Sequence, residues 1–335
     1  MSKVNSEIDI LKFLFSIVIV FCHWHFHNFY AGFLAVEFFF IVSGFFYARK
    51  MDQNNTGGGI LLDCVKFSPF LASGITVALI YHFLLNGWTL KTLRTTSLLA
   101  IGELLNFQMF GLPMFSSTGV TWYLSAMLIA KLLIFPILKT KNHLCILTLL
   151  CMFIYGYLNK NRGMLAGPGD WLGITYVGTL RGIAGISLGI LCHKLTEKLK
   201  TYNYTLIGRF FFTILECFLY LVSVCYMWKS RATQWDFYIV LILFIGIAIT
   251  MSEISFFSFI NRWKIPFFRN ASICIFLSHF YIVQYFEKNH PNFSGDEVKF
   301  LVIMQVIVCS TLTFLLSILY KKLGSFFYKK CFSVQ

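Results

Sequence analysis

The chain has 335 residues, of which 58% are hydrophobic, 19% aromatic and only 13% charged. A soluble domain usually carries roughly 25% charged residues, so this composition indicates a membrane protein and excludes a soluble domain, a disordered chain and a collagen. The ten cysteines form no Cys-x-x-Cys pair and mostly lie in apolar runs, which argues against a zinc site and a disulfide framework. The net charge of +14 becomes informative only once the basic residues are assigned to loops.

The apolar stretches predict a bundle of transmembrane helices. A spanning helix needs about 20 mainly apolar residues, and its backbone hydrogen bonds must be satisfied internally. Eleven stretches are candidates, and in chain order they are 8–28, 33–48, 69–87, 97–111, 121–138, 143–158, 172–193, 207–227, 236–252, 271–287 and 299–320. The weakest is 97–111, because it contains Glu103, Asn106 and Gln108.

The distribution of basic residues decides whether 97–111 spans. An extra crossing moves every later loop to the other side, and cytoplasmic loops are enriched in Lys and Arg. Without that crossing, 18 basic residues are cytoplasmic and 8 are outside; with it, the numbers are 11 and 15. Lys131 and Arg181 lie within spans, and the outer eight are Lys91, Arg94, Lys160, Arg162, Lys229, Arg231, Lys288 and Lys299. The sequence therefore predicts an all-α polytopic bundle of ten transmembrane helices, with 97–111 interfacial or re-entrant and both termini cytoplasmic.

We expect a single membrane-embedded domain over 1–335, without an appended soluble domain, because no internal repeat or long linker divides the chain. The first apolar run continues into a His-rich segment instead of a small-residue cleavage site, so it is expected to be a retained span and not a signal peptide. The expected location is the cell membrane, either the plasma or the inner membrane.

The first predicted span contains several ionisable residues, which are costly in a membrane and are therefore candidates for function. Asp9 and Lys12 are three residues apart and share a helix face at the cytoplasmic end, where an interfacial anchor pair is the simpler alternative. His23 follows about 21 Å farther along the helix. Its imidazole is suited to proton transfer near neutral pH.

A metal site is a further alternative for the His23, His25 and His27 run, but we expect none. His23 and His27 lie on one helix face and supply only two ligands, so the remainder would have to come from elsewhere, for example from His279. Contact with water at the membrane end accounts for His25 and His27 more simply.

The second span places Glu37 at its outer end, near His23 if the two spans form a tight hairpin. A carboxylate there can orient a histidine or raise its basicity. Ser43 and Gly44 are small enough for close helix contact, and packing alone also explains them.

These residues resemble the acyltransferase 3 family of integral-membrane acyltransferases. That family opens with Asp-x-x-Arg followed eleven residues later by His, and Asp9, Lys12 and His23 keep this spacing. Its next element, Gly-x-x-x-Val-Asp/Glu-x-Phe-Phe-x-x-Ser-Gly-Phe, is similar to residues 32–45. Weaker similarities occur, in the family's order, at 121–125, 179–189 and 272–280.

Two departures from the family pattern affect the donor site. Lys12 stands where the family usually has Arg, and Lys cannot make the bidentate contacts of Arg. The segment 63–69 reads Asp-x-x-Lys-x-x-Pro, where the family tends to have Arg-x-x-Arg-x-x-Pro. Its Asp63 cannot bind a phosphate.

The resemblance implies transfer of an acyl group, most often acetyl from acetyl-CoA, to a hydroxyl of a cell-surface or lipid-linked carbohydrate. It implies that His23 acts as general base or as transient acyl carrier and that Glu37 orients it. The expected substrate-binding residues are Asp9, Lys12, Ser43, Trp122, Arg181 and His279, and the expected donor-binding residues are Arg49, Lys50 and Lys66. Acyl-CoA is expected as co-substrate, with no tightly bound cofactor and no nucleic-acid partner.

Some alternatives stay open. Arg181 can form a packing salt bridge or contact substrate oxygens, and His279 is by default a hydrogen-bonded core histidine. The rival function is a carrier or flippase that exports a polysaccharide or a lipid-linked sugar. A carrier would be expected to show repeat symmetry and broken helices in matching positions, which the sequence lacks.

Overall fold

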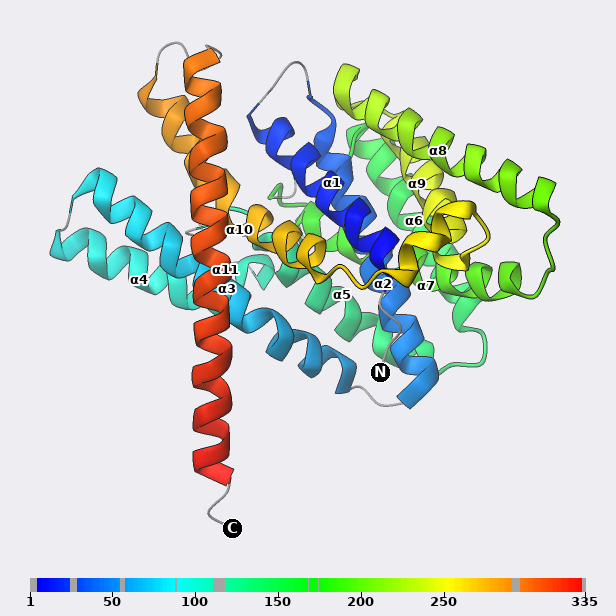
Figure 1. Cartoon of the computed structure of the whole chain (residues 1–335), viewed down its shortest axis with the longest axis horizontal. Coiled ribbons are helices and arrows are strands. Elements are labelled where there is room, and N and C mark those ends of the chain that lie inside the picture. The colour runs from blue at the N-terminus through cyan, green and yellow to red at the C-terminus, as the bar shows by residue number, and fades with distance from the viewer. Residues whose placement is uncertain are drawn as a thin grey trace. The chain divides into compact units, whose positions relative to one another are not determined.

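The computed structural model describes residues 5–24, 29–54, 58–87, 89–110, 118–167, 169–173, 175–290 and 296–332, and over these residues the chain is helical with connecting turns (Figure 1). The α-helices are α1 (Ser6–His23), α2 (Ala35–Asn54), α3 (Gly58–Asn86), α4 (Leu90–Leu104), α5 (Trp122–Leu138), α6 (His143–Arg162), α7 (Val177–Lys200), α8 (Leu206–Lys229), α9 (Asp236–Ser252), α10 (Pro266–Asn289) and α11 (Asp296–Phe332). Short 3-10 helices are η2 (Gly32–Leu34), η3 (Gln108–Phe110) and η4 (Phe256–Arg262). The all-α prediction is confirmed, and over the described residues each predicted apolar stretch overlaps one α-helix, with 97–111 also including η3.

By length and composition, five described helical segments are able to cross a membrane: Gly32–Gln53, Asp63–Leu85, His143–Arg162, Leu206–Lys229 and Glu297–Ser325. A sixth is added if α9 and η4, which meet at a bend of 58°, count as one broken span. The predicted number of ten is therefore not confirmed. The segment predicted to be interfacial or re-entrant, 97–111, comprises the second half of α4 and η3.

Polar residues set several helix ends. Asn5 caps α1, since its side-chain oxygen accepts a hydrogen bond from the Ile8 backbone N–H at 2.9 Å. Thr205 caps α8 in the same way through the Gly208 N–H. Helix α6 ends at Gly163, whose φ of 65° is typical of a helix C-terminus. These three helix ends therefore lie at polar or glycine residues that flank the apolar runs.

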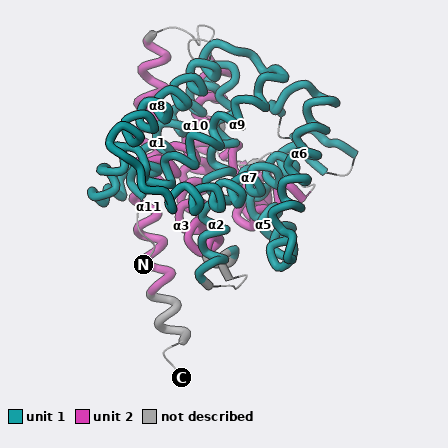
Figure 2. The backbone as a smooth tube through the Cα atoms, turned by 90° about the vertical axis from the view of Figure 1, so that its right-hand side faces the viewer, with its two compact units in different colours: residues 1–60, 123–269 teal, residues 61–122, 270–335 magenta. Residues whose placement is uncertain are grey.

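The chain forms two compact units, each built from two separate segments (Figure 2). Unit 1 consists of Met1–Ile60 and Tyr123–Arg269, and unit 2 of Leu61–Trp122 and Asn270–Gln335. Unit 1 therefore contains α1, α2, α6 to α9 and all of α5 except Trp122, whereas unit 2 contains α4, α11 and most of α3 and α10. The expectation of a single domain stays a prediction.

Helices α2 and α7 form the most extensive helix contact among the described residues of unit 1, and glycines allow it. A Cβ added at Gly44 of α2 would lie 2.2 Å from the Ile186 carbonyl oxygen. A Cβ at Gly189 of α7 would lie 2.1 Å from the Ile41 carbonyl oxygen. The backbones of the two helices therefore touch, as small residues permit in membrane proteins. The close packing expected for Gly44 is confirmed.

We predict that Gly44→Ala lowers stability by about 1–3 kcal/mol, because the new methyl group overpacks a backbone contact. Gly156→Ala is the matched control, since a Cβ there meets nothing within 4 Å. That control should keep or raise stability, because Ala is favoured over Gly in a helix by roughly 0.5–1 kcal/mol. The measurement is the midpoint of thermal unfolding in detergent, and equal midpoints for the two variants would contradict the prediction.

Candidate functional site

The first motif is spread along α1. Lys12 Nζ lies 3.1 Å from Asp9 Oδ1, so the predicted same-face pair forms, and the ammonium also lies 5.1 Å from the centre of the Phe46 ring. Asp9 is buried and Lys12 is partly exposed. His23 is the last residue of the same helix and is half-buried. Because α1 is continuous, the Asp9–Lys12 pair and His23 lie at opposite ends of it. His25 and His27 lie outside the described residues.

The second motif begins with a fully buried ion pair. Arg181 Nε donates to Glu37 Oε1 at 2.6 Å, and neither side chain is exposed. Arg181 also donates from Nη2 to the Phe33 carbonyl oxygen at 3.2 Å. The Tyr155 hydroxyl donates to the other Glu37 oxygen at 3.0 Å. The structure therefore contains the salt bridge expected as one alternative for Arg181, and its contact with substrate stays a prediction.

Glu37 is held in the first turn of α2, where a negative charge is stabilised by the helix dipole. Its hydrogen bonds within the described residues go to Arg181 and Tyr155. The expected role of Glu37 beside His23 stays a prediction.

The same ion pair is linked to His23 through the backbone of η2. Phe33, whose carbonyl accepts from Arg181, follows Gly32 in η2. A Cβ at Gly32 would lie 2.5 Å from Cys22 Cβ and 3.0 Å from the Val18 carbonyl oxygen. η2 therefore packs directly on the last turn of α1, next to His23. Through η2, the buried charges are therefore linked to Cys22, the residue before His23.

Ser43, the expected substrate contact on α2, lies 2.9 Å from the Tyr123 hydroxyl. The Tyr123 ring in turn packs on the Phe40 ring, with ring centres 4.6 Å apart. These contacts join α2 to the start of α5. They place the Ser43 hydroxyl among aromatic side chains and pair it with a second hydroxyl.

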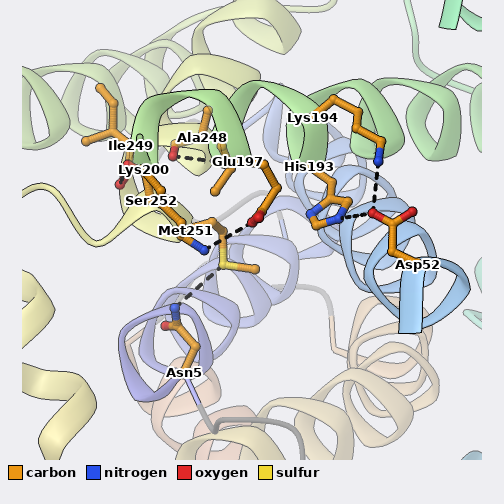
Figure 3. A network of polar contacts seen from close by, with 11 residues as sticks. Asn5, Asp52, His193, Lys194, Glu197, Lys200, Ala248, Ile249, Met251 and Ser252 are labelled. Atoms are coloured by element: carbon orange, nitrogen blue, oxygen red, sulfur yellow. Dashed lines mark hydrogen bonds and ion pairs between the residues drawn. The ribbon is translucent and has the colours of Figure 1, made fainter. Parts of the chain in front are cut away.

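A second polar contact between α2 and α7 was not predicted from the sequence. Asp52 Oδ2 lies 3.0 Å from His193 Nε2 and 2.9 Å from Lys194 Nζ (Figure 3). His193 also packs edge-on against Phe45. Glu37 begins α2 and Asp52 lies near its end, while Arg181 and His193 occur in the same order along α7. Helices α2 and α7 are therefore parallel, with an ionic contact near each end.

Unit 2 carries the two remaining expected residues of the acceptor site. His279 of α10 is fully buried, and its Nδ1 lies 3.0 Å from the Ile275 carbonyl oxygen, as expected for a hydrogen-bonded core histidine. Trp122 is the first residue of α5 and directly follows the segment 118–121. A Cβ at Gly119 would lie 1.9 Å from the Phe280 ring. The Trp122 segment and the His279–Phe280 segment therefore meet at Gly119.

The expected donor-binding residues fall in both units. Arg49 and Lys50 are half-buried near the end of α2 in unit 1, whereas Lys66 is exposed on α3 in unit 2. Asp63, which replaces a basic residue of the family pattern, is buried on the same helix as Lys66. The donor-binding assignments stay predictions. Over the part of the chain that the structure describes, no group of three or more His, Cys, Asp or Glu side chains is arranged to hold a metal.

Comparison with known proteins gives one match. A family model described as an acyltransferase domain matches residues 5–322, which is nearly the whole chain. No curated protein and no solved structure matches.

We predict that Arg181→Met destabilises the protein by about 3–5 kcal/mol, because it leaves the buried Glu37 carboxylate without its cation. The double variant Arg181→Met with Glu37→Gln should recover part of this loss, since no buried charge then remains. Thermal unfolding in detergent measures both effects.

Arg162→Met is the control for that series. Its partner Asp170 has a side chain that is 57% exposed, so the pair should contribute only about 0–1 kcal/mol. Equal losses for Arg181→Met and Arg162→Met, or strictly additive effects of the Arg181 and Glu37 changes, would overturn the assignment of a stabilising buried pair.

Proposed function

We propose that this chain, which belongs to the acyltransferase 3 family, moves an acyl group from acyl-CoA to a hydroxyl of a carbohydrate acceptor. Family membership and the apolar helices indicate a membrane acyltransferase. The more specific elements of the proposal are acetyl as the acyl group, a cell-surface or lipid-linked sugar as the acceptor, and His23 as the reacting side chain.

The observation that carries the proposal is the placement of the first motif on one helix. The Asp9–Lys12 pair and His23 are separated by nearly the full length of α1, about 21 Å between Asp9 and His23. Acyl-CoA has an anionic nucleotide at one end and a thioester at the other, joined by a long, thin arm. A donor bound along α1 can keep its phosphates near basic groups while its thioester reaches His23.

In the proposed reaction, a ring nitrogen of His23 accepts the proton of the acceptor hydroxyl while the oxygen attacks the thioester carbonyl. The carbon–sulfur bond breaks, the ester forms, and the proton passes to the departing thiolate of CoA. General base catalysis of this kind contributes typically 10²–10⁴-fold. In the alternative route, His23 first takes the acyl group from CoA and then transfers it to the hydroxyl.

Roles are also proposed for the other site residues. Glu37, held by Arg181 and Tyr155, fixes η2 against the last turn of α1 and so supports the position of His23. Ser43 with Tyr123 in unit 1 is proposed to contact the acceptor, and so, separately, are Trp122 and His279 in unit 2. Arg49 and Lys50 in unit 1 are proposed to contact the donor phosphates, and so, separately, is Lys66 in unit 2.

Ten spans with cytoplasmic termini are the proposed topology, and the parallel α2–α7 pair supports it. Two parallel helices packed along their length cross the membrane in the same direction. That requires an odd number of crossings between α2 and α7. Helices α3, α5 and α6 supply three, and a crossing by 97–111 would make the number even. The basic residues then gather on the side where an anionic coenzyme arrives.

We predict that His23→Ala lowers the rate of acyl transfer about a hundredfold or more, because it removes the general base. Purified protein is incubated with radiolabelled acetyl-CoA and methyl hexosides, and labelled ester is counted. His82→Ala, an exposed histidine on α3, is the control and should keep full activity. A folded His23→Ala variant with full activity would remove His23 from the proposed mechanism.

The same assay separates the two routes and the rival function. Stoichiometric release of CoA in the absence of acceptor indicates the acyl-carrier route, whereas a general base releases CoA only with acceptor present. A carrier or flippase forms no ester in detergent. The bend between α9 and η4 is a feature that carriers also use, but carriers have it in matching positions of two repeats.

A second prediction concerns topology. In sealed, right-side-out vesicles, a membrane-impermeant amine reagent should label Lys160 and Lys229, on the proposed outer side, and spare Lys139 and Lys194. Mass spectrometry of the labelled peptides reads out each lysine. If Lys139 and Lys194 were labelled from outside, the loops after α4 would lie on the opposite side of the membrane from the one proposed. That result would contradict the ten-span arrangement.

A further inference from the structure

Glu103, at the end of α4, is a buried carboxylate in a segment with no assigned role. Its side chain is only 1% exposed. Its Oε1 accepts hydrogen bonds from the Thr118 backbone N–H at 3.3 Å, from the Thr118 hydroxyl, and from the Thr121 hydroxyl at 2.8 Å. A buried carboxylate is costly unless several donors satisfy it, and here three donors come from the four residues 118–121.

Gln108 extends this network. Its Nε2 donates to the Thr121 hydroxyl oxygen at 2.9 Å, and the Thr121 hydroxyl donates to Glu103. Gln108, Thr118 and Thr121 are all buried. Glu103 and Gln108 are two of the three polar residues that made 97–111 a poor span. In the structure these two side chains hold the segment 118–121.

The segment 118–121 also contacts α10. Gly119 has a φ of 74°, which favours glycine, and the Phe280 ring occupies the space where its side chain would be. Phe280 follows His279, and Trp122 follows Thr121. The segment therefore contacts both the Glu103 carboxylate and the part of α10 that the acceptor site is proposed to use.

We propose that Glu103 is a positioning residue for the acceptor site: it fixes the segment 118–121 and thereby sets Trp122 against the His279–Phe280 part of α10. This inference rests on the proposed function. Glu103 acts through Thr118 and Thr121 and not by touching the reacting atoms. Its loss should therefore impair handling of the acceptor while leaving donor binding intact, because no expected donor-binding residue lies in the segment 118–121.

The activity test compares Glu103→Gln, Glu103→Ala and Thr121→Val with the wild-type protein, using radiolabelled acetyl-CoA and methyl hexosides. Glu103→Ala should lower kcat/KM for the hexoside at least tenfold, with the KM for acetyl-CoA unchanged. Glu103→Gln should recover part of the activity, because its amide oxygen still accepts hydrogen bonds. Glu287→Gln, an exposed carboxylate on α10, is the control for loss of charge and should match the wild type.

A double-mutant cycle of Glu103→Ala with Thr121→Val tests the mechanism. If Glu103 acts through Thr121, the two effects on kcat/KM are far from multiplicative. Multiplicative effects, equal losses for acetyl-CoA and hexoside, or wild-type kinetics in Glu103→Ala would each overturn the proposal.

A readout without turnover separates this inference from the proposed function. Val120, in the middle of the segment, is 2% exposed. A Val120→Cys side chain should resist alkylation by a membrane-permeant maleimide and become reactive when Glu103→Ala is added, as followed by mass spectrometry of its peptide. If the wild type forms no ester but Glu103→Ala makes Val120→Cys reactive, the proposed function fails. The conclusion that Glu103 fixes the segment 118–121 is then still supported. If Val120→Cys stays protected, the inference fails whatever the activity.

Discussion

The buried pair of Arg181 and Glu37 is the interaction on which unit 1 depends. Two charges inside an apolar bundle are tolerated only when they neutralise each other and when hydrogen bonds satisfy their remaining atoms. Here those bonds come from Tyr155 of α6 and the Phe33 carbonyl of η2, so one charge pair joins four elements. Among them, η2 lies against the last turn of α1, the turn that ends at His23.

The charge pair and the glycines act on the same two helices, α2 and α7. Gly44 and Gly189 let the two backbones touch, and the Arg181–Glu37 ion pair lies about two turns away along the same helix pair. Asp52 with His193 and Lys194 adds a second ionic contact farther along the same two helices. Polar contacts thus specify the register of α2 against α7, and glycines allow the two helices to approach closely.

Much of the fold could be predicted because hydropathy is a local property. All eleven apolar stretches coincide with helices, but their ends do not. Helix α3 begins at Gly58 and passes through Pro69, where the apolar run was expected to start. Hydropathy marks the apolar part of a helix, whereas capping residues and neighbouring polar turns decide where the helix ends. Hydropathy also does not say whether a helix crosses the membrane, so the number of crossings does not follow from the number of helices.

Some contacts of the candidate site could likewise be predicted from the sequence, and others could not. The Asp9–Lys12 pair follows from spacing, because residues three apart share a helix face. Sequence spacing does not report contacts between distant helices, so it does not decide whether Arg181 pairs with a carboxylate or with substrate. Glu103 was visible only as a residue that weakened a predicted span. Its role depends on a loop that returns to it fifteen residues later. Tertiary partners of polar groups were the information that the sequence alone lacked.

The sequence separation of Glu37 and Arg181, 144 residues, has a consequence for biosynthesis. At about 5–20 residues per second, the ribosome adds Arg181 roughly 7–30 s after Glu37. During that interval α2 has left the ribosome, and its carboxylate has no guanidinium to neutralise it. The partner of Glu37 in the folded chain is therefore synthesised long after α2, and the α2–α7 ion pair can form only once α7 has been made.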